Sequence, residues 1–223
     1  MVPRRIVIGA NSAVWRRLAT AFPSELEGVI SIGHAVVAGY SFLADDEVWV
    51  FAYAKDEAGN VALMDSLLQR GVRRMIYVST VSTRTCEVTK CYRYPRVKLA
   101  AQAEARRRLG ATILLLGLVY ADEHELPGGV SMVTRLADIA RLMSVGVPDS
   151  DRGRDILMAA PIERPFKSRI EQCAYSAYGL LLRSCGPYPC MLRPLDLLLR
   201  QIGWRWYGYF RIGNHLWTLN TSS

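Results

Sequence analysis

A tyrosine and a lysine stand four residues apart in the segment YPRVK, as Tyr94 and Lys98. In a helix this spacing puts both side chains on one face, one turn apart. The ammonium of Lys98 would favour ionisation of the Tyr94 phenol and could hold a ribose hydroxyl, so Tyr94 could act as a general acid or base. The same spacing also arises by chance on a half-exposed helix.

Hydroxyl side chains close the apolar run that precedes this pair. The segment YVSTVS contains Ser79, Thr80 and Ser82. A hydroxyl at the carboxyl end of a strand can hydrogen-bond a substrate oxygen and the tyrosine hydroxyl. Ser and Thr also favour such ends for the sake of the turn alone, so both interpretations stay open.

Gly9 follows a short β-branched run and precedes a helical pattern, in the segment GANSAV. A strand, turn and helix of this kind point backbone N–H groups and a helix N-terminus at an anion, usually a pyrophosphate. Only Gly9 remains of the three glycines of the dinucleotide-binding fingerprint, because Ser12 and Trp15 occupy the other two positions. An ordinary turn between strand and helix is the alternative.

Strands and helices alternate over the first 120 residues. The pattern predicts strands over 5–8, 28–32, 47–53, 74–79 and 111–119, and helices over 13–22, 57–70 and 95–109. Continuous apolar strands are typical of a parallel sheet covered on both faces. We therefore expect an α/β fold with a doubly wound sheet. Beyond Tyr120 the alternation stops, with loops over 122–129 and 147–154 and helices over 130–145 and 170–183.

The composition is that of an ordinary globular protein with a basic surface. The chain has 223 residues, 51% of them hydrophobic and 22% charged, and a formal net charge of +8. A positive surface favours anionic partners such as phosphorylated cofactors, nucleotide-linked substrates, nucleic acid or an acidic membrane face. The five cysteines lack the spacing of a metal site, so we expect no metal and a reducing compartment. The N-terminal apolar stretch is too short for a signal peptide, which favours a cytoplasmic protein.

Taken in order, these features resemble the short-chain dehydrogenase/reductase superfamily. The order is a glycine turn, an apolar strand EVWVFAY, a strand ending in Ser-Thr, a Tyr-x-x-x-Lys helix and a strand ILLLGLVY. The likeness is greatest to the extended branch, the NAD-dependent epimerase/dehydratase family, which acts on nucleotide sugars. It covers roughly residues 4 to 121, and the segments GVRRMIYVST, YPRVKLAAQAEA and ATILLLGLVYA carry its specific part.

The resemblance implies a Rossmann-like dinucleotide-binding domain over residues 1–121 and a small, mostly helical substrate lobe over 122–223, packed on the first and not independent. Tyr94 would match the catalytic tyrosine and Lys98 the ribose-binding lysine. Thr80 would match the catalytic Ser/Thr, with Ser79 and Ser82 as alternates. The resemblance also implies a pyrophosphate lining of Gly9, Asn11, Ser12 and Ala13, and an adenine and ribose border of Phe51, Ala52 and Tyr53.

The sequence also departs from the family pattern. Gly33 and His34 stand after the second strand, where users of NAD carry an acid for the ribose 2′-OH. Arg16 or Arg17 could meet a 2′-phosphate, so NADP is preferred to NAD. The short chain before residue 47 predicts that one strand–helix unit is missing. Further along, Leu115 and Ala121 replace a usual arginine and a usual glycine.

We therefore expect an NAD(P)-dependent oxidoreductase, epimerase or dehydratase acting on a hydroxyl or keto carbon of a nucleotide sugar or related metabolite. The alternative is a catalytically degenerate Rossmann scaffold that senses a nucleotide or joins a membrane-associated assembly. A homodimer through the catalytic helix is a further expectation, although Arg106–Arg108 would crowd part of that face.

The remaining polar residues allow several interpretations. The carboxylates Asp122, Glu123 and Glu125 could supply a second acid or base, or form a solvated loop. Three histidines share no motif: His34, His124 and His215. Basic residues of the lobe could meet a substrate diphosphate, namely Arg154, Arg164, Lys167 and Arg169. The tail segment GWRWYGYFR (203–211) suits packing on the domain, a membrane surface or single-stranded nucleic acid, of which nucleic acid is the least favoured.

Overall fold

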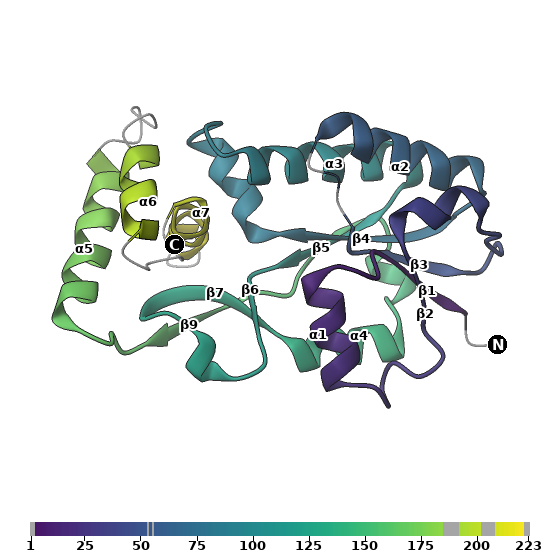
Figure 1. Cartoon of the computed structure of the whole chain (residues 1–223), viewed down its shortest axis with the longest axis horizontal. Coiled ribbons are helices and arrows are strands. Elements are labelled where there is room, and N and C mark those ends of the chain that lie inside the picture. The colour runs from purple at the N-terminus through teal and green to yellow at the C-terminus, as the bar shows by residue number, and fades with distance from the viewer. Residues whose placement is uncertain (1–2, 53, 55, 185–191, 202–207, 221–223) are drawn as a thin grey trace.

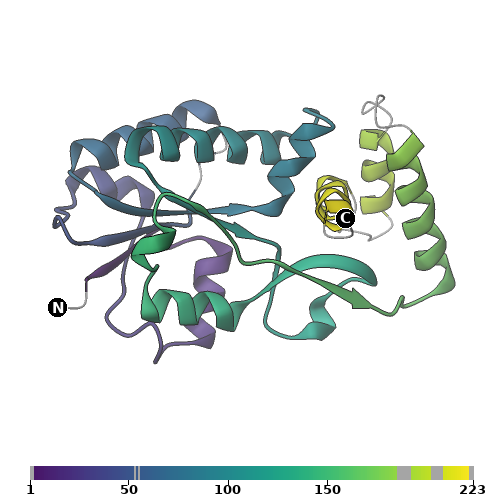
Figure 2. The same ribbon diagram turned by 180° about the vertical axis from the view of Figure 1, so that it is seen from behind.

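A six-stranded parallel sheet forms the centre of the molecule (Figures 1 and 2). The computed structural model describes residues 3–52, 54, 56–184, 192–201 and 208–220. The strands lie in the order β2-β1-β3-β4-β5-β8, with bounds Ile30–Ile32, Arg5–Ile8, Glu47–Val50, Arg74–Thr80, Thr112–Leu116 and Asp155–Leu157. The expected α/β doubly wound fold is confirmed. Its winding reverses between β1 and β3, so a ligand crevice is expected at the carboxyl ends of these two strands.

Helices cover both faces of this sheet. Figure 1 shows α2 (Glu57–Gln69) and α3 (Arg93–Leu109) on one face, and α1 (Ala13–Ala21) and α4 (Leu136–Val145) on the other. Successive strand side chains point to opposite faces. Tyr77 of β4 therefore belongs to the core under α2 and α3, while its neighbour Val78 belongs to the core over α1 and α4. The two apolar cores pack on opposite faces of β4 and β5 and so fix the position of the carboxyl ends of these strands.

The sheet is shortened at its β2 edge. Strand β2 has three residues, and only the 3-10 helix η1 (His34–Gly39) lies between it and β3. A complete unit would place a helix and a further strand there. The short sequence between β1 and β3 predicts that one strand–helix unit is lacking, and the structure shows that it is lacking at this edge.

The segment after β5 forms a second sheet that sequence periodicity did not reveal. Its order is β6-β7-β9, with bounds Leu118–Tyr120, Gly129–Arg135 and Ala160–Arg164. The single strand expected over 111–119 divides at Gly117 into β5 and β6. The prediction of a helix over 130–145 is wrong for its first part, because this part forms strand β7. Apolar residues there fit both periods, and pairing with β6 and β9 decides for the strand.

The chain returns to the first sheet beyond residue 121. Strand β8 pairs with β5, and helix α4 covers one face of the sheet beside α1. Part of the segment expected as a C-terminal lobe packed on the first domain thus completes the layers of the six-stranded sheet. The remaining helices are α5 (Arg169–Ser184), α6 (Leu192–Gln201) and α7 (Tyr209–Asn220).

Helix α7 lies between the sheet and the helices α5 and α6 (Figures 1 and 2). Buried Arg211 donates to the backbone oxygens of Gly128 at 2.7 Å and Val130 at 3.0 Å, next to strand β7. On its other side, Trp217 donates through Nε1 to the oxygen of Val81 at 3.1 Å, in the 3-10 helix η2 (Val81–Glu87). The end of the tail therefore packs on the domain, while residues 203–207 of the aromatic and basic segment lie outside the described residues.

None of the helices in the described ranges combines the length and the apolar character needed to cross a bilayer.

Candidate active site

A cavity of about 190 Å³ opens at the carboxyl ends of the central strands. It brings together residues that the sequence singled out in four separate segments, among them Ser12, Phe51, Thr80 and Tyr94. The full lining is Ser12, Ala13, Val14, Phe51, Val78, Ser79, Thr80, Tyr94, Lys98, Leu116, Gly117 and Val119. The place is the one that the reversal of winding predicts for a ligand.

Gly9 shapes the turn at the rim of this cavity. Its φ is +107°, a region that side-chain-bearing residues rarely adopt, and a Cβ there would lie 2.6 Å from the backbone nitrogen of Ala52. The turn therefore needs glycine both for its backbone conformation and for its close approach to the chain after β3. Gly9 does not line the cavity itself.

Replacing Gly9 by alanine should lower the free energy of unfolding by about 2 to 4 kcal/mol, because a strained backbone and a backbone clash occur together. The measurement is urea unfolding followed by tryptophan fluorescence. Gly33→Ala is the matched control, since Gly33 has an extended φ of −73° and no atom within 4 Å of the added Cβ. Equal stabilities of the two variants would contradict this account of the turn.

The N-terminus of α1 supplies the backbone donors that face the cavity. The N–H groups of Gly9 and Ser12 already donate within the protein, to Ile32 at 3.0 Å and to Gly9 at 2.8 Å. The Ser12 side chain makes no capping hydrogen bond to the helix. The donors left for an anion are those of the first helical turn, at Ala13 and Val14. Ser12 and Ala13 therefore line the cavity as expected, and Val14 joins them.

The strand-end hydroxyls have unequal surroundings. Thr80 donates through Oγ1 to Ser82 Oγ at 3.2 Å and accepts from the Ser82 N–H at 3.2 Å, which caps η2. Ser79 is buried and donates to Oε1 of Gln102 on α3 at 3.1 Å. Both residues line the cavity, but Thr80 is the more exposed of the two and so has the better access to a ligand.

Helix α3 presents Tyr94 and Lys98 in its first turns. The helix begins at Arg93 and ends at Leu109, and the left-handed conformation of Gly110 caps it. Tyr94 and Lys98 both line the cavity, one helical turn apart as expected. The ring of Tyr94 lies 5.4 Å from the ring of Tyr209 on α7, so the C-terminal helix borders the candidate catalytic tyrosine.

Lys98 is the buried cation of the site. Its side chain is 5% exposed, and Nζ donates to the backbone oxygen of Val78 at 2.9 Å and lies 4.9 Å from the centre of the Tyr77 ring. Burial lowers the pKa of Lys98 to about 7, because water no longer stabilises the ammonium. The carbonyl and the ring face are the groups that hold the ammonium in place.

Besides Gly9, three of the predicted cofactor-binding residues that the structure describes lie outside the cavity. Asn11 is exposed, and Ala52 is half-buried beside Gly9. Tyr53 falls outside the described residues. Arg16 lies in a neighbouring groove of about 530 Å³ that meets the cavity at Ala13. Phe51 does line the cavity, and its ring lies 5.9 Å from that of buried Trp15.

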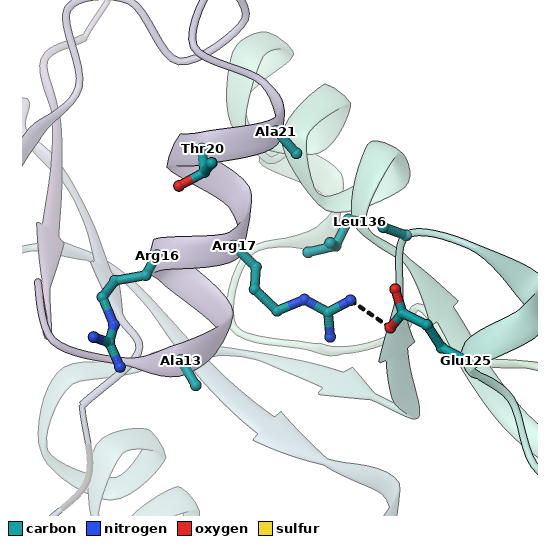
Figure 3. A pocket seen from close by; sticks show the side chains of 8 residues that line it. Ala13, Arg16, Arg17, Thr20, Ala21, Glu125 and Leu136 are labelled. Carbon is teal, nitrogen blue, oxygen red and sulfur yellow. Dashed lines mark hydrogen bonds and ion pairs between the residues drawn. The ribbon is translucent and has the colours of Figure 1, made fainter.

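Figure 3 shows this groove between α1 and the loop that follows β6. Arg17 points across it and donates to Glu125 at 2.5 Å and to the backbone oxygen of Val119 at 3.2 Å. Arg16 points away from both Arg17 and Glu125. The carboxylate of Glu125 therefore forms an ion pair with Arg17 in the groove and does not line the cavity.

The other acidic and basic candidates are also placed away from the cavity. The guanidinium of Arg164 donates to the carboxylate of Glu123 at 2.9 Å, so these two residues form a surface ion pair. Arg154 precedes β8 at the amino end of the sheet, which is the opposite edge, and cannot meet a substrate in this cavity. None of the described histidines lines the cavity. In the described ranges, no cluster of three His, Cys, Asp or Glu residues could hold a metal ion.

Sequence reasoning missed the floor of the site. Gly117 lies where the chain passes from β5 to β6, and a Cβ there would be 2.3 Å from the backbone oxygen of Met132. Its N–H donates to Thr134 Oγ1 at 2.9 Å. The lone glycine inside an apolar run was the available signal, since such a glycine often marks close backbone approach. Val14, Leu116 and Val119 carried no such signal.

Comparison with known proteins shows the class of fold. No family model matches the chain, and no curated protein matches its sequence significantly. A putative NAD-dependent epimerase/dehydratase from Bacillus halodurans matches with a TM-score of 0.51 and 19% identity, over 76% of this chain and 99% of that one. The oxidoreductase ylbE from Lactococcus lactis matches with a TM-score of 0.51 and 16% identity, over 73% and 92% of the two chains.

A third solved structure is the Bordetella bronchiseptica enzyme WbmG in complex with NAD. It matches with a TM-score of 0.53 and 12% identity, over 73% of this chain and 75% of that chain. At identities this low the likeness shows a shared fold. The Rossmann-like fold expected from the resemblance to dehydrogenases and epimerases is thereby confirmed.

Proposed function

We propose that the protein is an NAD(P)-dependent enzyme of the short-chain dehydrogenase type that acts on a hydroxyl or keto carbon. The observation that carries the proposal is the lining of one cavity by the uncapped N-terminus of α1, Thr80, Tyr94 and Lys98. These residues come from three separate segments, and a purely structural role would not require them to meet at the ligand edge of the sheet.

The residues present fit a nicotinamide dinucleotide. The N–H groups of Ala13 and Val14 would receive the pyrophosphate, and Lys98 would hold ribose hydroxyls. Phe51 would form an apolar border. The cofactor, when bound, would exchange a hydride with the substrate carbon.

The protein side chains would handle the proton and the orientation of the substrate. Tyr94 would take the proton from a substrate hydroxyl as the carbon is oxidised and return it when a carbonyl is reduced. Thr80 would hold the substrate oxygen next to that phenol. The ammonium of Lys98, one turn along α3, would stabilise the phenolate. Removal of water by the apolar lining would strengthen both interactions.

The cofactor preference and the substrate are finer proposals. NADP is favoured over NAD because Gly33, not an acid, follows β2, so nothing there would repel a 2′-phosphate. A nucleotide sugar is the favoured substrate class. WbmG, which has this fold, has also been solved with both NAD and UDP.

Titration with NADPH and with NADH tests the proposal. Nicotinamide fluorescence gives the Kd, and a ligand at a hundred times its Kd should add about 2.7 kcal/mol of stability, seen as a rise in Tm. We expect tighter binding of NADPH than of NADH. Binding of neither cofactor at millimolar concentration would overturn the proposal and favour the scaffold alternative. Tighter binding of NADH would reject only the preference for NADP.

A further inference from the structure

The C-terminal helices α5 and α6 each expose apolar side chains that pack against no other part of the chain that the structure describes. On α5, Ile170, Cys173, Ala177 and Leu180 are all exposed, at the spacing that puts them on one face of a helix. Ile170 and Leu180 are 73% and 66% exposed. This stripe differs from the face that α5 turns to the core, where Tyr178 is buried.

Helix α6 repeats the arrangement. Asp196 and Leu199 are buried on its inner side, while Leu197 and Leu198 are 54% and 56% exposed. The core between α5, α6 and α7 is built by Tyr178, Leu199 and other inward residues, so the exposed leucines add nothing to it. Figures 1 and 2 place α5 and α6 at the end of the molecule farthest from the N-terminus, with α7 between them and the sheet.

The C-terminal part of the chain is rich in basic residues. From Lys167 to the C-terminus the sequence has seven Lys and Arg residues against two acids, a net charge of +5 out of +8 for the whole chain. Of the two acids, Asp196 is buried, and the half-exposed Glu171 accepts the backbone N–H of Lys167 at 2.8 Å. Lys167 and Arg169 are exposed beside Ile170.

We propose that the outer face of α5 and α6 docks on the surface of a bilayer that contains anionic phospholipids. An amphipathic helix with leucines on one side and basic residues beside them lies in the interface of such a membrane, held by apolar burial and by attraction to the headgroups. A second copy of the chain would bring its own exposed Lys167 and Arg169 against this face, so charge disfavours self-association. The proposal does not depend on the proposed catalytic function.

Vesicle flotation with the purified full chain tests this docking. We expect the protein to float with vesicles of equal parts phosphatidylglycerol and phosphatidylcholine, and to stay in the soluble fraction with phosphatidylcholine alone. Raising the salt from about 0.1 M to about 0.5 M NaCl should reduce the bound fraction, because the Debye length shortens. Equal flotation with both kinds of vesicle, or flotation with neither, would overturn the proposal.

Matched charge variants locate the surface. The double variant Leu197→Glu/Leu198→Glu should weaken binding at least about tenfold, because two acids replace apolar contacts and oppose the anionic surface. Leu68→Glu/Leu99→Glu on α2 and α3 makes the same change at exposed leucines of the sheet layer and should bind as the wild type. Unchanged binding of the first variant would contradict the assignment.

A second variant guards against misfolding of α6. Ile170→Glu/Leu180→Glu changes only the outer stripe of α5, and its Tm shows whether the fold persists. With Tm retained it should lose flotation in the same way. If a second copy of the chain covers this face instead, size-exclusion chromatography will show it. If the wild type elutes as a dimer, the α6 variant as a monomer and neither floats, the face is an interface between copies and the membrane proposal is wrong.

Discussion

Tyr94→Phe is expected to lower the turnover by about two to four orders of magnitude, which is the usual contribution of a general acid or base. The substitution removes only the hydroxyl, and the ring keeps its place 5.4 Å from Tyr209. Binding of NADPH should be unchanged within a factor of about two, since the N–H groups proposed to bind the pyrophosphate belong to α1. The measurement is steady-state oxidation or reduction of the nicotinamide with a panel of nucleoside-diphosphate sugars.

Tyr92→Phe is the matched control for this effect. Tyr92 lies two residues before Tyr94, is buried, and its ring is 5.7 Å from the same Tyr209, but it does not line the cavity. Loss of its hydroxyl should change the turnover by less than about threefold. Equal losses in both variants would mean that the phenols act through packing of α7, and would remove Tyr94 from its proposed role.

The contact between Tyr94 and Tyr209 could not be predicted from the sequence. The two residues are far apart in sequence, and their approach depends on how α7 packs against η2 and β7. Thr85 Oγ1 donates to the backbone oxygen of Tyr209 at 2.7 Å. A Cβ added at Gly213 would lie only 3.0 Å from Ser82 Cα, so the glycine permits the close approach of α7 to η2. The spacing of residues along the chain does not predict these long-range contacts.

Local pattern was enough to predict the first part of the fold and the side chains at the centre of the candidate site. The apolar run into Thr80 and the helical period after Tyr94 are each specified by neighbouring residues, so β4 and α3 follow from sequence. Strand β7 did not, because Val130 to Arg135 fits a helix as well as a strand until it pairs with β6 and β9. The same limit applies to Arg16, whose place in the groove depends on the loop after β6.

The pH dependence of stability should show whether Lys98 is buried as an ammonium. Its pKa is about 7 in the folded protein against 10.5 as the ordinary value, so between these limits the unfolded chain holds one proton more. Stability therefore rises with pH across this window, by about 1.4 kcal/mol per pH unit. The contribution is complete above about pH 10.5 and is lost as the pH falls through about 7, a total of about 5 kcal/mol.

Lys98→Met removes this titration and keeps most of the side-chain volume. We expect the free energy of unfolding of the wild type, measured in urea, to gain on that of Lys98→Met by about 1.4 kcal/mol per unit between about pH 7.5 and pH 10. Near pH 7 the variant should be the more stable protein, because it carries no buried charge. Lys90→Met at an exposed position should run parallel to the wild type. Parallel curves for Lys98→Met as well would mean that the folded protein keeps Lys98 charged at high pH, with the Val78 carbonyl and the Tyr77 ring offsetting the cost of burial.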